Sequence, residues 1–392
     1  MTNFIYDIPT KNYFGPDQLE HLSEEISSFG KKVLLVYGGG SIKRTGLYDA
    51  LAEQIKKAGA SLFELGGVEP NPRIESVRKG AALCKENKIE VIVAAGGGSA
   101  MDAAKLISAA ALVDFDPWLF MAKKEKIQET LPVITVLTIA ATGSEMNPTC
   151  VISNPETDEK TGLTDKHLFP KAAFCNPLLT YSVNNYQTAC GSADILSHIM
   201  EVYFNTNQEL YMLDRSMEAM MKTVIKYAPI ALAKPDDYEA RANLMWTSSW
   251  AINGYISGCN KSPWSCHPIE HQLSAVYDIT HGLGLAIITP HWMEFVLKDS
   301  DQSKVQKFCD FATNVWNLPP QEDKMALAKA AIEKTKEFFY KTLGLKSSLS
   351  ELGITNEHFA EMAKKACGSS GIIKGWKKLT PSDVEAIYRA AL

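Results

Sequence analysis

Residues 90–105 read EVIVAAGGGSAMDAAK, and this stretch decides how the first half of the chain is expected to fold. The apolar run Glu90–Ala95 is typical of a strand that is buried on both faces. Three glycines, Gly96–Gly98, end that run, and the Ala-rich segment Ser99–Leu112 has the composition of a helix. A strand that passes through a tight turn into a helix is the repeating unit of a parallel sheet.

The same pattern recurs on both sides of this stretch. The sequence predicts further strands at Lys32–Tyr37, Ser61–Leu65 and Val133–Thr138, and helices at Leu47–Ala58 and Ile74–Asn87. After about residue 185 strand-like runs almost disappear, and helical periodicity covers 189–204, 211–233, 240–255, 268–278 and most of the chain beyond 301. We therefore predict an α/β domain at 1–185, a parallel sheet with flanking helices, followed by an all-α domain at 186–392.

Composition excludes several classes of protein. Of the 392 residues, 46% are hydrophobic and 22% are charged, which is typical of a packed globular protein and not of a disordered one. The formal net charge is −5 and no block of like charges occurs, so the electrostatic pattern of a nucleic-acid binder is missing. No apolar stretch approaches the ~20 residues of a membrane span, and the start shows no signal-peptide pattern. The eight scattered cysteines fit reduced thiols in a cytoplasmic protein.

The loop Gly96–Ser99 opens the predicted helix, where glycines let a ligand approach the backbone and unpaired N–H groups attract a phosphate. The alternative is structural, because Ser99 and Asp102 have the spacing of a capping box and the glycines also suit a tight turn. Neither the dinucleotide fingerprint nor the nucleoside-triphosphate loop is present.

Two further loops follow predicted strands. Gly38–Ser41 repeats the glycine pattern and precedes Lys43, with no acidic side chain at the strand end. If this loop meets the adenosine ribose, small residues and a cation favour NADP over NAD; the alternative is a surface turn. The loop Thr138–Asn147 offers hydroxyl groups, and its alternative is an ordinary connection.

Five of the eight histidines fall between residues 198 and 291. Asp194 and His198 are four residues apart on one predicted helix, His267 and His271 share the same spacing, and His281 follows. Imidazole-rich ligation with one carboxylate suits Zn²⁺ or Fe²⁺. The alternative is that each pair is structural, an ion pair on a helix face or histidines packed in a core.

A competing motif overlaps this cluster. His267–His271 reads HPIEH and fits H-x-x-E-H, the inverted zinc-peptidase pattern, in which both histidines bind metal and Glu270 acts as the base. A peptidase has no use for glycine-lined phosphate loops, which weighs against this alternative.

Taken together, the chain resembles the iron-containing (group III) alcohol dehydrogenases over essentially its whole length, with butanol dehydrogenases of the clostridial type and NADPH-dependent aldehyde reductases as the most similar branches. The resemblance rests on these segments: YGGGSIKRTG (37–46), GVEPNPR (67–73), AAGGGSAMDAAK (94–105), ATGSEMN (141–147), ADILSHIMEVYF (193–204), DYEARANLMW (237–246), WSCHPIEHQLSAVYDITHGLGLAI (264–287) and TPHWM (289–293).

The resemblance assigns roles to residues of both predicted domains. It implies one divalent metal, Fe²⁺ or Zn²⁺, held by Asp194, His198, His267 and His281, with His271 beside it as a proton-relay group. It implies that the cofactor pyrophosphate and nicotinamide ribose lie on Gly96, Gly97, Gly98, Ser99 and Asp102, and that the rest of the cofactor lies against Gly38, Gly39, Ser41, Thr138, Thr142, Ser144, Asn147 and Lys160. Gly39 stands where NAD-preferring relatives can carry Asp, which points to NADP(H), with NAD(H) possible.

The implied activity is reversible hydride transfer between NADP(H) or NAD(H) and a primary alcohol and aldehyde pair such as butanol and butanal. The implied partners are that small-molecule substrate and further copies of the chain in a dimer or larger homo-oligomer, with no nucleic acid and no membrane. Alternatives on the same scaffold are a polyol or glycerol dehydrogenase, a broad aldehyde reductase, a dehydroquinate-synthase-like cyclase and a non-catalytic nucleotide-binding protein.

Overall fold

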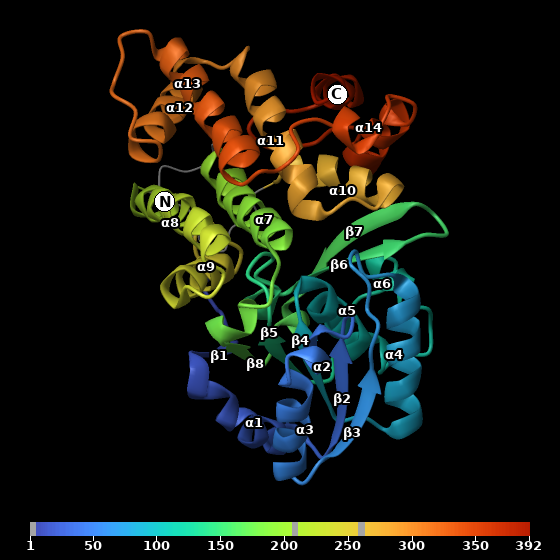
Figure 1. Cartoon of the computed structure of the whole chain (residues 1–392). Coiled ribbons are helices and arrows are strands. Elements are labelled where there is room, and N and C mark those ends of the chain that lie inside the picture. Colours follow the sequence, from blue (N-terminus) through green and yellow to red (C-terminus); the bar gives the residue numbers. More distant parts are fainter. Residues whose placement is uncertain (1–4, 206–210, 258–262) are drawn as a thin grey trace. The chain divides into compact units, whose positions relative to one another are not determined.

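The computed structural model describes residues 5–205, 211–257 and 263–392, which divide into two compact units (Figure 1). The first, called the α/β unit, comprises Asp7–Val183 and Ser248–Asn253. The second, called the helical unit, comprises Asn184–Thr247 and Gly254–Leu392, with residues 5–6. The sequence places the division at 185/186 and gives no sign that Ser248–Asn253 groups with the α/β unit.

The α/β unit is built on a six-stranded parallel sheet with the strand order β1-β8-β5-β4-β2-β3. The fold class predicted from the sequence is confirmed. The strands are β1 Lys11–Phe14, β2 Lys32–Tyr37, β3 Ser61–Leu65, β4 Val91–Gly96, β5 Val133–Leu137 and β8 Ala172–Cys175. The four expected strands occupy the centre and one edge, whereas the four-residue strands β1 and β8 were not predicted.

Helices cover both faces of this sheet. On one face α1 (Leu22–Phe29) and α3 (Leu47–Lys57) pack against alternate strand residues such as Leu35 and Val93, which are fully buried. The other face carries α5 (Gly98–Ala110), which packs against β4 and against α4 (Ile74–Asn87). Two short helices, α2 (Ser41–Arg44) and α6 (Trp118–Met121), complete the connections.

A two-stranded antiparallel hairpin, β6 (Thr149–Asn154) and β7 (Glu159–Thr164), follows the loop after β5. The sequence did not predict it. Ser153 in β6 pairs with Arg73, and its N–H donates to the Pro72 carbonyl at 2.9 Å, so the turn before α4 lies against the hairpin.

The helical unit contains α7 (Asn185–Tyr203), α8 (Tyr211–Ala233), α9 (Tyr238–Trp250), α10 (Cys266–Tyr277), α11 (His281–Leu297), α12 (Gln302–Asn314), α13 (Lys324–Lys336), α14 (Phe359–Cys367) and α15 (Pro381–Ala390). The last turn of α9 belongs to the α/β unit. Helix α7 packs on α8 and α11, and α11 packs on α10 (Figure 1). None of the described helices combines the length and the apolar character that crossing a membrane requires.

Candidate metal centre and nucleotide loops

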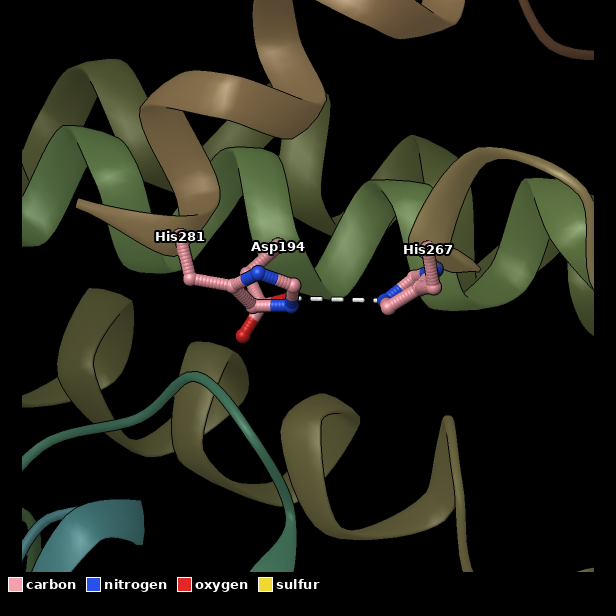
Figure 2. A group of neighbouring side chains, drawn as sticks. All are labelled: Asp194, His267 and His281. Atoms are coloured by element: carbon pink, nitrogen blue, oxygen red, sulfur yellow. Dashed lines mark ion pairs between the residues drawn. The ribbon is translucent and has the colours of Figure 1, made fainter. Parts of the chain in front are cut away.

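Three helices of the helical unit bring an aspartate and two histidines together. Asp194 lies in the middle of α7, His267 in the first turn of α10, and His281 is the first residue of α11. Asp194 Oδ1 is 3.9 Å from His267 Nε2 and 3.7 Å from His281 Nε2, and one ligand atom from each residue lies within 4.8 Å of the other two. Figure 2 shows the three side chains turned toward one another.

His198, the fourth predicted ligand, lies beside this group. It is one turn after Asp194 on α7, and its Nε2 is 3.3 Å from Asp194 Oδ1. Its ring stacks on that of His267 with centroids 4.9 Å apart, and Trp264 lies against both rings. The helical spacing predicted from the sequence therefore places the Asp194 and His198 side chains on one face.

The electrostatics of the group suit a divalent cation. Burial lowers the pKa of His198 to about 3, so this imidazole is neutral at physiological pH and keeps a lone pair for coordination. Asp194 Oδ1 and His267 Nε2 are buried and have no hydrogen-bond partner among the described residues. Buried polar atoms are normally satisfied, and two facing acceptor atoms left without a donor are what a bound cation would satisfy. This donor set of imidazoles and one carboxylate fits Zn²⁺ or Fe²⁺.

Two glutamates lie behind the histidines. Glu201 Oε1 is 3.1 Å from His267 Nδ1, and Glu270 Oε2 contacts His281 Nδ1. Both carboxylates are buried, Glu270 completely. Glu201 is not among the residues predicted from the sequence, and Glu270 was predicted only as the base of the peptidase alternative. For Glu201 a signal existed, because it follows Asp194 by seven residues, or two helical turns, and so shares its face.

Two glycines let α11 approach its neighbours closely. A Cβ on Gly282 would lie 2.0 Å from the carbonyl oxygen of Cys190 on α7. A Cβ on Gly284 would lie 2.7 Å from Oε1 of Glu270. Glycine at these positions therefore sets how near His281 comes to Asp194.

His271 lies next to the group without joining it. Its ring centroid is 5.4 Å from that of His281 and 6.3 Å from that of His267. Its ligand atom groups with those of Glu270 and His281, not with that of His267. The peptidase alternative is wrong in its geometry, because His267 and His271 do not share a ligand group and the Glu270 carboxylate contacts His281.

In the α/β unit the glycine loop Gly96–Ser99 meets the loop that follows β5. A Cβ on Gly97 would lie 2.6 Å from Ile139, and one on Gly98 would lie 2.4 Å from Thr142 Oγ1. Thr138 N donates to the Gly96 carbonyl at 2.9 Å. The first N–H groups of α5 thus open beside the half-buried Thr138 and Thr142, an arrangement that can hold a phosphate.

The capping-box alternative is wrong for this helix. Gly97 is the N-cap of α5 and no side chain caps it. Asp102 instead accepts hydrogen bonds from Ser144 Oγ at 2.6 Å and from Val151 N at 2.8 Å. Asp102 is buried because the β5–β6 segment covers that side of the helix, so its carboxylate holds the predicted cofactor residue Ser144 in place.

A buried lysine that the sequence analysis did not single out completes this cluster. Lys105 is fully buried, and its ammonium donates to Ser144 Oγ, the Asn147 carbonyl and the Thr149 carbonyl, each at 2.8 Å, and to Asn147 Oδ1 at 3.1 Å. Burial lowers the pKa of Lys105 to about 8, which leaves it mainly charged at pH 7. Lys105 fixes the conformation of the loop that carries two predicted cofactor residues.

The third loop, Gly38–Ser41, follows β2 at the same edge of the sheet, since β2 pairs with β4. Gly39 is exposed, and a Cβ there would meet nothing within 4 Å. The Lys43 ammonium, however, lies 3.4 Å from Glu64 Oε2 and over the Tyr48 ring, so its charge is already partly compensated.

The last predicted cofactor residue, Lys160, lies in the hairpin of the α/β unit. It is on β7 and donates to Asn71 Oδ1 at 2.8 Å. Its position next to the turn before α4 depends on the pairing of that turn with β6.

Comparisons with known proteins agree along the chain. The profile described as iron-containing alcohol dehydrogenase matches residues 9–177, and that of the C-terminal domain of the Fe-containing alcohol dehydrogenase family matches residues 188–392. NADH-dependent butanol dehydrogenase B of Clostridium acetobutylicum is 47% identical, with 100% of both chains covered. The NADPH-dependent aldehyde reductase of Escherichia coli is 35% identical over 93% of each chain. The crystal structure of NADH-dependent butanol dehydrogenase A from Thermotoga maritima has a TM-score of 0.94 at 36% identity, covering 100% of this chain and 99% of that one. The chain belongs to the iron-containing alcohol dehydrogenase family.

Proposed function

We propose that this protein interconverts primary alcohols and aldehydes, with butanol and butanal as the model pair, by hydride transfer to and from a nicotinamide dinucleotide. The observation that carries the proposal is the group of Asp194, His267 and His281, joined by His198, in which two buried acceptor atoms have no hydrogen-bond donor among the described residues. Relatives that are 35% to 47% identical over nearly the whole chain are described as butanol dehydrogenases and an aldehyde reductase.

Each group of residues has a separate task in this reaction. A divalent metal supplies Lewis acidity toward the substrate oxygen and the nicotinamide supplies the hydride chemistry. Asp194, His198, His267 and His281 are the proposed ligands. The first three are buried, which keeps water from competing for their donor atoms, and His281 is half-buried. The glycine loop Gly96–Ser99 is proposed to hold the pyrophosphate at the start of α5.

His271 is the proposed proton-relay group. It is half-buried and lies beside His281, outside the group of ligand atoms around Asp194. An imidazole can accept the alcohol proton and return it at neutral pH, because its unperturbed pKa is about 6.5.

Both nucleotides are kept in the proposal. The exposed Gly39 leaves room for a 2′-phosphate where a larger side chain would not, which favours NADP(H). Against this, Lys43 is engaged by Glu64, and the two butanol dehydrogenases of Clostridium acetobutylicum, 47% and 46% identical to this chain, are described as NADH-dependent. Cytoplasmic location, assembly into a dimer or larger oligomer and the choice between Fe²⁺ and Zn²⁺ stay predictions.

The test follows nicotinamide absorbance with butanal as substrate. Chelated enzyme is assayed with NADPH and with NADH, before and after addition of Fe²⁺ or Zn²⁺, with 1,3-propanediol and glycerol as comparison substrates in the oxidative direction. Metal-dependent turnover of butanal supports the proposal, and turnover of the polyols alone would replace it with the polyol dehydrogenase. Asp194→Asn should abolish metal-dependent turnover. Asp299→Asn, which changes an exposed carboxylate paired with Lys377, is the matched control and should not affect it.

A further inference from the structure

In two of the four proposed metal ligands, His267 and His281, the ring nitrogen Nδ1 faces a buried carboxylate. His267 has Glu201 Oε1 at 3.1 Å from Nδ1, and His281 has Glu270 Oε2 in contact with Nδ1. In both rings the opposite nitrogen, Nε2, is the atom that faces Asp194. His198 differs, because its Nδ1 is buried and has no hydrogen-bond partner within the described part of the chain.

This pairing determines the tautomer of each ring. An ionised carboxylate only accepts hydrogen bonds, so the imidazole nitrogen that faces it must carry the proton. Nδ1 of His267 and His281 is then the donor, and Nε2 keeps its lone pair toward Asp194. If either ring turned over, its buried carboxylate would lose the hydrogen bond from Nδ1, which costs stability.

Glu270 is held for this task by its surroundings. It is completely buried, and Ser274 Oγ donates to its other oxygen. Gly284, three residues after His281 on α11, leaves the space that the carboxylate occupies. Its contacts thus link the middle of α10 to the start of α11.

Glu201 has a second task. Its Oε2 accepts from Ser265 N and its Oε1 from His267 N, both at 2.8 Å. These N–H groups belong to the first turn of α10 and to the residue before it, and α10 has no cap from its own N-cap residue Ser265. A carboxylate from α7 therefore caps α10, where negative charge is favourable.

We propose that Glu201 and Glu270 are positioning residues of the metal centre, a role that rests on the proposed metal site. Each fixes the Nε2-ligating tautomer and the orientation of one histidine, and each adds a negative charge that raises the basicity of that ligand. Glu270 acts through His281 alone, whereas Glu201 acts through His267 and also through the N-terminus of α10.

The variant Glu270→Gln separates charge from shape. Glutamine has the same size, its oxygen can still accept from His281 Nδ1, and its amide can donate to Ser274 Oγ. We expect the metal-free variant to melt within a few degrees of the wild type. We expect the dissociation constant for Zn²⁺, measured by competition with a chromophoric chelator, to rise ~10-fold or more. The visible spectrum of the Co²⁺-loaded protein should shift, which a purely structural role would not cause.

Glu201→Gln should behave differently, because the glutamine amide would place a donor against a backbone N–H of α10. We expect both a lower melting temperature without metal and weaker Zn²⁺ binding. The matched control is Glu218→Gln. Glu218 is a buried carboxylate on α8 that accepts from Tyr203 Oη at 2.8 Å, from Asn314 Nδ2 at 3.0 Å and from Arg215, and no histidine of the described residues is among its hydrogen-bond partners. The variant Glu218→Gln should lower the melting temperature and leave the Zn²⁺ dissociation constant unchanged.

The outcomes separate this inference from the proposed function. If the wild-type protein binds neither Zn²⁺ nor Co²⁺, the metal centre itself is wrong and the inference falls with it. If the wild type binds both metals while Glu270→Gln has the same Zn²⁺ dissociation constant and Co²⁺ spectrum, the inference is overturned and the metal site stands. The inference is established if Zn²⁺ binding weakens in Glu270→Gln and in Glu201→Gln but not in Glu218→Gln.

Discussion

Gly282 offers the sharpest test of how the metal centre is assembled. It follows His281 directly, and alanine there would place a Cβ 2.0 Å from the oxygen, 2.7 Å from the carbon and 3.1 Å from the Cα of Cys190. All three are backbone atoms of α7, so no side-chain rotation relieves the clash. A close carbon–oxygen contact is about 3.3 Å, and α11 must therefore move away from α7 by roughly 1.3 Å.

A shift of this size is large compared with the tolerance of a metal site, in which ligand distances hold to about 0.2 Å. The variant Gly282→Ala should thus lose His281 as a ligand while keeping its side chain. We expect the Zn²⁺ dissociation constant to rise at least ~100-fold, the upper end for losing a supporting contact. Overpacking should also cost about 3 kcal/mol of stability.

Chelator competition for Zn²⁺ and thermal unfolding followed by circular dichroism measure the two effects. Gly284→Ala should weaken Zn²⁺ binding less, because its Cβ meets the Glu270 side chain and not the backbone of another helix, so that only the carboxylate contact to His281 is disturbed. Gly162→Ala on β7 is the control, since its Cβ would make an ordinary contact at 3.7 Å with Val151. If Gly282→Ala kept the wild-type Zn²⁺ affinity and melting temperature, the close packing of α11 on α7 would not be what positions His281.

Three further predictions concern other parts of the chain. Burial lowers the pKa of His198 from its ordinary value of 6.5 to about 3 in the folded chain. Below pH 6.5 the unfolded chain therefore binds a proton at His198 that the folded chain does not bind. The metal-free protein should therefore lose stability from pH 6.5 to 5 by up to ~2 kcal/mol more than His198→Asn, as chemical denaturation at both pH values would reveal. Lys105→Met removes the cation that acts most strongly on Asp102 and should weaken NADH and NADPH binding together, measured by nucleotide fluorescence; unchanged binding would mean that Lys105 does not support the loop. Glu64→Gln releases Lys43 and should shift the ratio of dissociation constants toward NADPH by a few-fold; an unchanged ratio would mean that Gly38–Ser41 does not meet the ribose.

The central strands and their helices could be predicted because their signals are local. Lys32–Tyr37 carries an apolar run that ends at Gly38, and Ser61–Leu65 is a short, mainly apolar run that ends at Gly66; the structure has the same bounds for both. The strands β1 and β8 were missed because each has only four residues and their pairing with neighbours far along the chain decides their conformation. The hairpin β6–β7 was missed because its strands are largely polar and do not alternate clearly.

Some residues of the candidate site could likewise be predicted from local signals, and others could not. Asp194 and His198 share a helix face at a spacing that the sequence states directly, and glycines before a helix mark a phosphate loop. Asp102 shows the limit of local rules. Its spacing from Ser99 fits a capping box, but its carboxylate accepts hydrogen bonds from Ser144 and Val151 and does not cap the helix. Lys105 was not singled out because a lysine within an Ala-rich helix gives no sign that its charge will be buried.

Local sequence patterns were enough to predict the parallel α/β architecture of the first half, the helical second half and the residue types that a metal and a nucleotide require. The packing of the helices determines which nitrogen of His267 and of His281 faces Asp194, and which glutamate contacts the other nitrogen. Glu201 and His267 are 66 residues apart and meet because α7 and α10 pack together. Hydrophobic periodicity specifies the face that a helix buries, but not the element that it will face, because that choice depends on packing summed over the whole core.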